Sequence, residues 1–338
     1  MRSSSPSVPR WIRPLPAPAT TPPRLTGPWA PLDTRLDEVE RFPLPSGAGP
    51  EDVAVDPADR PVSGDSLGHL WRWSADPRPG QPPELFADTG GRPLGIEVDP
   101  RDGTLVVCDS FRGLLRVTDD GVVTELCTEA AGRPLRLCNN AAVARDGTVF
   151  FTDSSDRYPV THYKRDLLEH RPNGRLLAYR PGGSTEVLTD GLYFPNGVAL
   201  TPDESALLLV ETGSHRLSRI PLATGVPQIL ADLPAYPDNV SATGEGTYWI
   251  ALPNPRMALL ERLLPYPRLR QLAAFVPDRL QPRPARHTMV ALVNGDGTVL
   301  RTLHGPAGRY RMVTGVRQHG DALWLGSLAE RGIARVPL

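Results

Sequence analysis

Six short segments of the chain resemble one another, and each begins with a residue that could take part in a shared site. In each case an apolar run follows, such as Asp-Val-Ala-Val after Glu51 or Gly-Val-Ala-Leu after Asn196. If the segments are equivalent units of a ring, their first side chains point toward one axis. The six starting residues are Glu51, Leu94, Asn140, Asn196, Asp238 and Thr314.

Oxygen atoms dominate this set, which favours a hard divalent cation. Two carboxylates facing each other across a tunnel would repel, and a cation bound by carboxylate and amide oxygens removes that repulsion. No His or Cys stands at these positions, which argues against Zn²⁺. Mg²⁺ is less suited than Ca²⁺ to a cage built only from protein. We therefore expect Ca²⁺, or another divalent cation, to be held by Glu51, Asn140, Asn196, Asp238 and the adjacent Asn239, with Leu94 and Thr314 lining the pocket.

Each of these residues also has a plainer interpretation when it is taken alone. An Asn before a Gly, as in Pro195-Asn-Gly, is commonly a turn residue, and Pro237-Asp-Asn can be understood in the same way. The recurrence of oxygen-bearing side chains at equivalent places is what favours a metal site over four separate turns.

The spacing of the segments predicts the fold that positions them. The starts are 42 to 76 residues apart, and four-stranded propeller blades repeat about every 40–50 residues. Short β-rich runs separated by Asp-Gly turns fit antiparallel strands. We predict an all-β chain forming a six-bladed β-propeller, with residues 36–43 supplying the strand that closes the ring. A pair of β-sandwiches would explain the strands but not six equivalent starts.

The domain boundaries follow from the same pattern. Residues 1–31 are rich in Pro and are expected to form a disordered tail, and residues 32–338 form the propeller. The long gap before the last blade holds an insertion at 254–286, where apolar spacing predicts two short amphipathic helices. We expect them to cover the ligand face of the propeller, although they could instead pack on a blade edge.

Composition excludes several other classes of protein. The 338 residues carry 37 basic and 38 acidic side chains, so charge gives no reason to expect nucleic acid or an anionic membrane as partner. The three cysteines lack metal-site spacing and indicate a reducing, cytoplasmic location. No Gly-x-Ser-x-Gly elbow, phosphate loop or dinucleotide fingerprint occurs. A small molecule is the expected partner, and the sequence does not fix the oligomeric state.

Several motifs carry a family resemblance. Phe151-Thr-Asp-Ser-Ser, Phe194-Pro-Asn-Gly-Val-Ala-Leu, Tyr236-Pro-Asp-Asn and Leu323-Trp-Leu-Gly-Ser-Leu resemble the strictosidine synthase-like branch of the calcium-dependent propeller superfamily. That superfamily includes the SMP-30/gluconolactonases, paraoxonases and diisopropylfluorophosphatases. The resemblance implies that Glu51, Asn140, Asn196 and Asp238 match the cation ligands of its hydrolytic members.

The departures from the family pattern concern the catalytic base. In strictosidine synthases a Glu on the last blade has that role, and this chain has Thr314 there. In paraoxonases a His on the second blade has it, and this chain has Leu94. The resemblance therefore implies a metal site without either family's base.

We expect a metal-dependent hydrolase that acts on a lactone or other ester, with the cation polarising the carbonyl. Asp238 is the nearest carboxylate for accepting a proton, and His162 and His304 are further candidates on loops of the same face. The alternatives are a non-hydrolytic condensing enzyme and a non-catalytic propeller braced by the cation. The acidic residues that end second strands, Asp109, Asp153 and Glu211, either orient ligands or cap turns.

Overall fold

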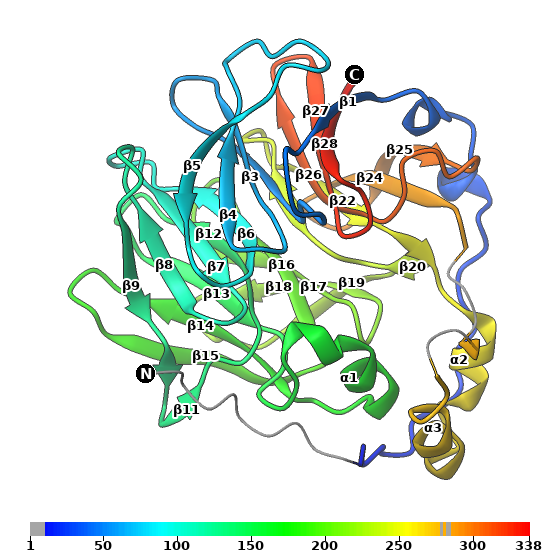
Figure 1. Ribbon diagram of the computed structural model, residues 1–338. Coiled ribbons are helices and arrows are strands. Elements are labelled where there is room, and N and C mark those ends of the chain that lie inside the picture. Colours follow the sequence, from blue (N-terminus) through cyan, green and yellow to red (C-terminus); the bar gives the residue numbers. More distant parts are fainter. Residues whose placement is uncertain (1–10, 278–279, 282–284) are drawn as a thin grey trace.

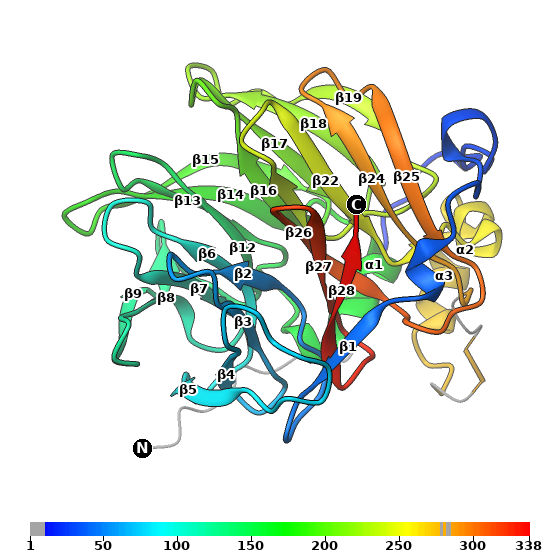
Figure 2. The same cartoon turned by 90° about the horizontal axis from the view of Figure 1, so that it is seen from above.

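The computed structural model of this chain describes residues 11–277, 280–281 and 285–338. Within these residues the chain forms six four-stranded antiparallel sheets, arranged around a common centre (Figure 1, Figure 2). Blade 1 consists of β2 (Val53–Val55), β3 (Pro61–Gly64), β4 (His69–Arg72) and β5 (Glu84–Asp88). Blade 2 consists of β6 (Pro93–Val98), β7 (Leu105–Asp109), β8 (Gly113–Val117) and β9 (Val123–Cys127). Blade 3 consists of β12 (Cys138–Val143), β13 (Val149–Asp153), β14 (Gly174–Tyr179) and β15 (Thr185–Leu192).

The second half of the chain repeats this arrangement. Two-stranded ladders join β10 (Glu129–Ala130) to β11 (Arg133–Pro134) and β20 (Ala235–Tyr236) to β23 (Asn254–Pro255). Blade 4 consists of β16 (Pro195–Leu200), β17 (Ala206–Glu211), β18 (Arg216–Pro221) and β19 (Gln228–Asp232). Blade 5 consists of β21 (Val240–Ala242), β22 (Thr247–Leu252), β24 (Thr288–Asn294) and β25 (Val299–Gly305). Blade 6 consists of β26 (Val313–His319), β27 (Ala322–Ser327), β28 (Gly332–Pro337) and β1 (Glu40–Pro43).

The last blade joins the two ends of the chain. β1 pairs antiparallel with β28, with Glu40 opposite Arg335 and Pro43 opposite Gly332. The inner strands also contact one another in a closed series, in the order β2, β6, β12, β16, β21 and β26, and back to β2. Closure protects the sheet edges at the junction of the ring. The predicted six-bladed all-β propeller, including a closing strand within residues 36–43, is confirmed.

Close approach of neighbouring inner strands explains two glycines near the axis. A Cβ atom on Gly197 would lie 2.1 Å from the backbone nitrogen of Val240 in the next blade. A Cβ atom on Gly315 would lie 2.7 Å from a carboxylate oxygen of Asp52 in blade 1. These glycines let the blades pack tightly enough to bring their first residues to one axis.

Helices occupy the two long insertions. After η3 (Val160–His162), α1 (Tyr163–Glu169) lies between β13 and β14, while α2 (Ala258–Leu263) and α3 (Pro267–Ala273) lie between β22 and β24. The two helices between β22 and β24 fall inside the predicted insertion at 254–286, of which residues 278–279 and 282–284 lie outside the described residues. α3 contacts both α1 and α2 (Figure 1).

The segment before the propeller makes defined contacts from residue 11 onward, and includes η1 (Gly27–Trp29) and η2 (Arg35–Asp37). The backbone nitrogen of Arg13 donates to Glu169 Oε1 at 2.5 Å, and Trp29 packs in an apolar cluster with blades 4 and 5. These contacts differ from the loose tail expected for residues 1–31, because bulky apolar side chains between the prolines find partners. Residues 1–10 lie outside the described residues.

Candidate functional site

The inner strands carry β-bulges at the point where they reach the axis. In blade 2, Pro93 pairs with Asp109 and Ile96 with Val107, so two residues oppose one. Blades 1 and 5 have the corresponding pairs directly before their first ladder residue. The six axial pairs are Glu51-Asp52, Leu94-Gly95, Asn139-Asn140, Asn196-Gly197, Asp238-Asn239 and Thr314-Gly315.

This register changes which asparagine of blade 3 is structurally equivalent to Glu51. The equivalent of Glu51 in blade 3 is Asn139, and Asn140 is the equivalent of Asp52. Asn140 Oδ1 accepts a hydrogen bond from the backbone nitrogen of Val198 at 3.2 Å, just as Asp52 Oδ2 accepts one from Ile96 at 3.2 Å. Asn140 therefore links blade 3 to blade 4. A bulge between two adjacent asparagines leaves no sign in the sequence, and this made the alignment wrong by one residue.

Four buried oxygen atoms near the axis have no hydrogen-bond donor among the described residues. They are Glu51 Oε2 and the Oδ1 atoms of Asn139, Asn196 and Asn239. Asn239 Nδ2 donates to Glu51 Oε1 at 3.1 Å, and Asp238 lies within hydrogen-bonding reach of Asn196 and Glu51. Buried acceptors without donors are costly, so these oxygens are available to a bound cation or to donors such as water.

The carboxylates of this group are held in an unfavourable environment for two negative charges. Burial raises the pKa of Glu51 well above its usual value, and the neighbouring charges of Asp238 and Asp52 raise it further. Burial likewise raises the pKa of Asp238 to about 7, although hydrogen bonds with Asn196 and Glu51 act in the opposite direction. A bound cation would favour the charged forms of both groups. The donor set of carboxylate and amide oxygens fits a hard divalent cation.

Two hydroxyl groups orient the axial asparagines. Asn139 Nδ2 donates to Ser154 Oγ at 2.8 Å, and Ser154 Oγ donates to the carbonyl of Pro195 at 2.6 Å. Asn196 Nδ2 donates to Thr212 Oγ1 at 3.1 Å, which in turn donates to the carbonyl of Pro237 at 2.6 Å. In both cases the amide nitrogen is engaged and the amide oxygen remains available.

Sequence reasoning missed these hydroxyls and considered their acidic neighbours instead. Asp109, Asp153 and Glu211 accept backbone hydrogen bonds, from Arg92, Leu137 and Tyr193 among others, and so fasten loops. The available signal was the hydroxyl residue that directly follows each acid, as in Asp153-Ser154 and Glu211-Thr212.

The two expected pocket residues lie in different surroundings. Leu94 packs in an apolar cluster with Leu137 and Phe194, against which residues of η3 and α1 lie. Thr314 Oγ1 donates to the backbone carbonyl of Glu51 at 2.8 Å and so links blade 6 to blade 1. The insertion that holds α1 thus packs over the axial ends of blades 2 to 4.

Within the described residues, neither expected histidine forms a hydrogen bond or ion pair with the axial group. His304 is on β25, the outermost strand of blade 5, and its Nδ1 lies 2.9 Å from Nε2 of His287. Burial lowers the pKa of His304 to about 4. His162 ends η3, and its Nδ1 lies 2.9 Å from the hydroxyl of Thr161. Of the three expected catalytic residues, Asp238 alone belongs to the axial group.

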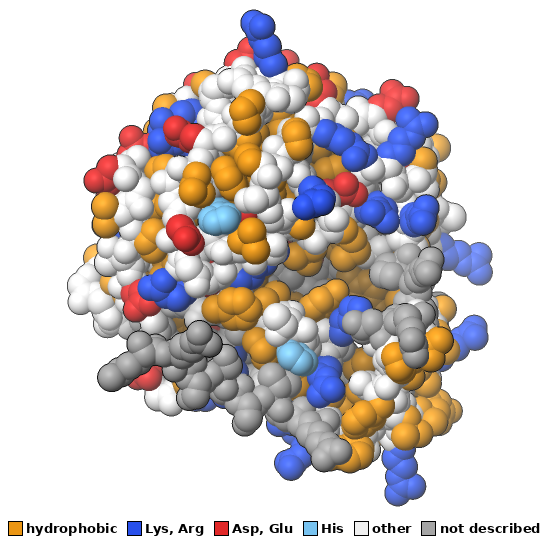
Figure 3. Space-filling view, viewed as in Figure 1, with side chains coloured by type: hydrophobic (Ala, Val, Ile, Leu, Met, Phe, Trp, Pro, Cys, Tyr) orange, Lys and Arg blue, Asp and Glu red, His pale blue; other side chains and the backbone are white. Residues whose placement is uncertain are grey.

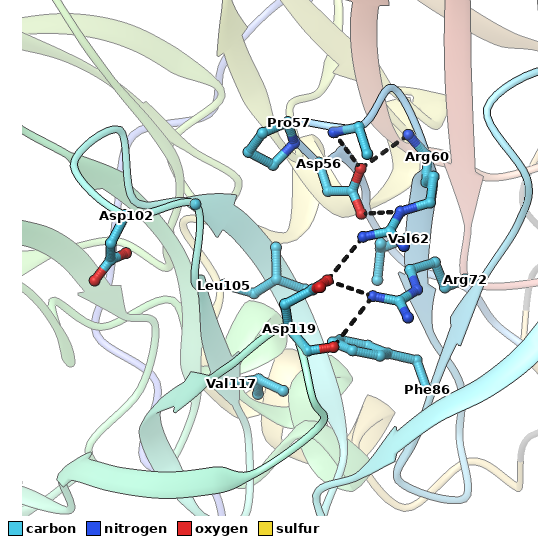
Figure 4. A pocket seen from close by; sticks show the side chains of 12 residues that line it. Asp56, Pro57, Arg60, Val62, Arg72, Phe86, Asp102, Leu105, Val117 and Asp119 are labelled. Atoms are coloured by element: carbon cyan, nitrogen blue, oxygen red, sulfur yellow. Dashed lines mark hydrogen bonds and ion pairs between the residues drawn. The ribbon is translucent and has the colours of Figure 1, made fainter.

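A separate hollow of about 300 Å³ lies between blades 1 and 2 (Figure 4). It is lined by the turns after the first strands, which are on the face opposite the axial pairs. Asp119 bridges Arg60 and Arg72 there, with both contacts at 2.7 Å, and Arg60 also pairs with Asp56. Because these charges already pair with one another, the hollow is a weaker candidate than the axial group.

Other metal sites and membrane-spanning helices are not found among the described residues. Within residues 11–277, 280–281 and 285–338, no group of three or more His, Cys, Asp or Glu side chains could hold a metal. None of the described helices has the length and apolar character needed to cross a bilayer.

Comparison with known proteins agrees with the fold and identifies the family. The strictosidine synthase family matches residues 139–223, and the N-terminal family of strictosidine synthase-like proteins matches residues 27–73. Strictosidine synthase-like protein 6 of Arabidopsis thaliana is 38% identical over 259 residues, which cover 75% of this chain and 69% of the relative. The chain belongs to the strictosidine synthase-like family.

Relatives of this strictosidine synthase-like protein extend beyond plants. The adipocyte plasma membrane-associated protein of Salmo salar is 31% identical over 344 residues, covering 94% of this chain and 82% of the relative. Among solved structures, a gluconolactonase from Xanthomonas campestris matches with a TM-score of 0.64 at 22% identity, covering 96% of this chain and 98% of that chain. A regucalcin from Agrobacterium tumefaciens, described as a calcium-binding protein, matches with a TM-score of 0.60 at 15% identity, covering 88% and 92%. These structures share the propeller fold.

The revised register of this strictosidine synthase-like protein gives a direct test with two neighbouring asparagines. Asn139→Ala is expected to weaken Ca²⁺ binding about 10–100-fold, because it removes an axial oxygen. Asn140→Ala is expected to lower the free energy of unfolding by about 1–2 kcal/mol, because it removes a link between blades, while Ca²⁺ affinity changes less than threefold. Calorimetric titration and thermal melting check the pair. The opposite pattern would restore Asn140 to the ligand set.

Proposed function

We propose that this strictosidine synthase-like protein is a divalent-cation-dependent hydrolase of lactones or other esters, with Ca²⁺ as the preferred cation. The observation that carries the proposal is the set of four buried oxygens without donors, supplied by blades 1, 3, 4 and 5. Oxygen-only coordination from carboxylates and amides is what Ca²⁺ accepts. The residues proposed to hold it are Glu51, Asn139, Asn196, Asp238 and Asn239.

When bound, such a cation polarises a carbonyl oxygen and stabilises the negative charge that develops on it. The protein's own groups do the rest. Asn139 and Asn196 are held with their oxygens toward the axis by Ser154 and Thr212. Asp238 is the carboxylate placed to receive a proton from the attacking water as the water oxygen bonds to the carbonyl carbon.

The apolar cluster of Leu94, Leu137 and Phe194 lies beside the axial group under α1. Its side chains are almost fully buried, so the cluster reduces the access of bulk water to this side of the axial group. Charge interactions at the axial group are stronger in such surroundings than in water.

Hydrolysis is favoured over condensation by the residue on the last blade. Thr314 is buried, and its hydroxyl already donates to the carbonyl of Glu51, so this position offers no carboxylate base. One structural neighbour is a gluconolactonase, an enzyme named for a lactone substrate, and this supports the proposal.

The proposal is tested with purified protein, with and without a chelator, on a panel of γ- and δ-lactones and aryl esters. Turnover that disappears with chelator and returns with Ca²⁺ is the expected result. A rise in melting temperature with Ca²⁺ but no turnover on any substrate would favour a cation that only braces the ring. Turnover that is unchanged by the chelator would overturn the metal-dependent mechanism.

A further inference from the structure

The two helices between β22 and β24 each bury a charged side chain and expose leucines. In α3, Arg270 is buried at 2% exposure, while Leu269 and Leu272 are 49% and 66% exposed. In α2, Glu261 is buried and Leu259 is exposed. A surface helix of a globular protein normally buries its leucines and exposes its charges.

The buried charges explain why the helices hold this orientation. Arg270 donates to the carbonyl oxygens of Leu168 and Glu169 at the end of α1 at 3.1 and 3.2 Å. Glu261 pairs with Arg256 at 2.8 Å, and both side chains are almost fully buried. These polar contacts fix the inner faces of the helices and leave several apolar side chains outward.

The N-terminal segment extends the same apolar area. The ring of Trp11 meets the ring of Phe275 with centroids 4.8 Å apart, and Gln271 Nε2 donates to the carbonyl of Ile12 at 3.1 Å. Figure 3 shows hydrophobic side chains gathered over α2 and α3, with basic side chains nearby. We name this area the helical surface, and its exposed members are Trp11, Leu259, Tyr266, Leu269, Leu272 and Phe275.

Charge distinguishes the possible occupants of the helical surface. Glu261 is the single acidic residue in 11–31 and 257–277, and it is buried. The exposed charged residues of these stretches are arginines, including Arg13, Arg262 and Arg268. A second copy of the chain would bring arginines against arginines. An anionic lipid surface accepts both the apolar side chains and the arginines.

We propose that the helical surface rests on the interface of an anionic membrane, with the leucines and aromatic rings among the acyl chains and the arginines at the headgroups. The net charge of the whole chain is close to balanced, but this face is basic and apolar. No spanning helix is required, since interfacial helices lie in the plane of the membrane. α3 contacts α1, which packs over the axial ends of blades 2 to 4. Contact with lipid would thus bring the axial face close to apolar substrates dissolved in the membrane.

Vesicle co-sedimentation with the full chain tests the proposal. The wild type is expected to bind vesicles of phosphatidylglycerol and phosphatidylcholine in equal parts, to bind pure phosphatidylcholine more weakly, and to be released by salt. Leu269→Asp with Leu272→Asp is expected to reduce binding at least about tenfold. Arg262→Gln with Arg268→Gln is expected to reduce binding to the anionic vesicles about fivefold per arginine.

The matched control is Leu85→Asp with Val226→Asp, which places the same charges on exposed apolar positions elsewhere on the propeller. It should bind like the wild type, and thermal melting should show every variant folded. Wild type that stays in the supernatant, or leucine variants that sediment as well as wild type, would overturn the proposal. So would a dimer in solution that Leu269→Asp with Leu272→Asp converts to monomer without any change in sedimentation.

Discussion

Asp238→Asn is expected to lower turnover by about 10²–10³-fold on any ester or lactone substrate and to abolish the rise in melting temperature that Ca²⁺ produces. The substitution keeps the shape of the side chain and removes one of the two carboxylates proposed to hold the cation, the other being Glu51. An amide oxygen can still face the cation, but half of the negative charge that holds it is lost. The same carboxylate is also the proposed proton acceptor, so cation binding and substrate turnover are lost together.

When a chelator removes the cation, Asp238→Asn is not expected to lower the melting temperature. Without a cation, Asp238 and Glu51 are buried carboxyl groups whose charges oppose each other. Asp238→Asn removes that repulsion, so with chelator present the variant is expected to melt at the same temperature as the wild type or higher. A merely structural lesion would lower the melting temperature in both conditions.

Asp76→Asn serves as the matched control, since Asp76 is exposed and lies 3.5 Å from Arg335 in a surface ion pair. It should leave both turnover and the Ca²⁺-dependent shift unchanged. If Asp238→Asn retains a normal Ca²⁺-dependent shift, the axial group does not hold the cation, and the proposed function loses its main support.

The sequence predicted the propeller because the information needed for it is periodic. Six segments with the same pattern, with strands and turns at regular intervals, define a ring without any knowledge of side-chain contacts. The closing strand near residues 36–43 was predictable for the same reason, because a ring leaves one blade to be completed from the other end of the chain.

The site was predicted less completely, because its details depend on contacts that do not repeat along the sequence. The bulge that selects Asn139 over Asn140 is a matter of one extra residue between ladder pairs. The roles of Ser154 and Thr212 depend on hydrogen bonds between neighbouring blades. His304 was expected near the site because its loop is on the correct face, but its strand is the outermost of its blade. A position along the chain indicated the face of the ring but not the distance from its axis.

The helical insertion shows a different limit. Apolar spacing predicted helices at 254–286, and α2 and α3 are present there. The spacing did not say which way the apolar side chains would face, and Leu269 and Leu272 are exposed. Periodicity identifies an apolar face but does not say whether protein, lipid or another partner covers it.

Arg175→Met is expected to lower the free energy of unfolding by about 3–5 kcal/mol, the largest loss of stability that we predict for a single substitution. Arg175 and Asp153 are both fully buried, and Arg175 Nη2 lies 2.8 Å from Asp153 Oδ2. Arg175 also donates to the carbonyl oxygens of Ala130 and Pro134 at 2.9 and 3.0 Å. Methionine fills much of the space but removes the donors that Arg175 supplies to Asp153 Oδ2 and to these carbonyls.

The loss of Arg175 should also affect the axial group, because Asp153 anchors the loop that leads to this group. Asp153 Oδ1 accepts from the backbone nitrogen of Leu137 at 2.9 Å, two residues before Asn139, and the next residue, Ser154, orients the Asn139 amide. Arg175→Met is therefore expected to weaken Ca²⁺ binding as well, at temperatures where the variant is still folded. Denaturant unfolding measures the first effect and calorimetric titration the second.

Arg180→Met is the matched control on the same blade, because Arg180 pairs with Glu186 in an exposed ion pair. Exposed pairs contribute about 0–1 kcal/mol, so this variant should unfold and bind Ca²⁺ almost like the wild type. Arg175→Met with Asp153→Leu should recover part of the lost stability, since the unpaired buried charge is gone, but not the Ca²⁺ affinity, since the loop before Asn139 has lost its anchor. Equal stability of the single and double variants would show that lost packing rather than an unpaired charge causes the defect.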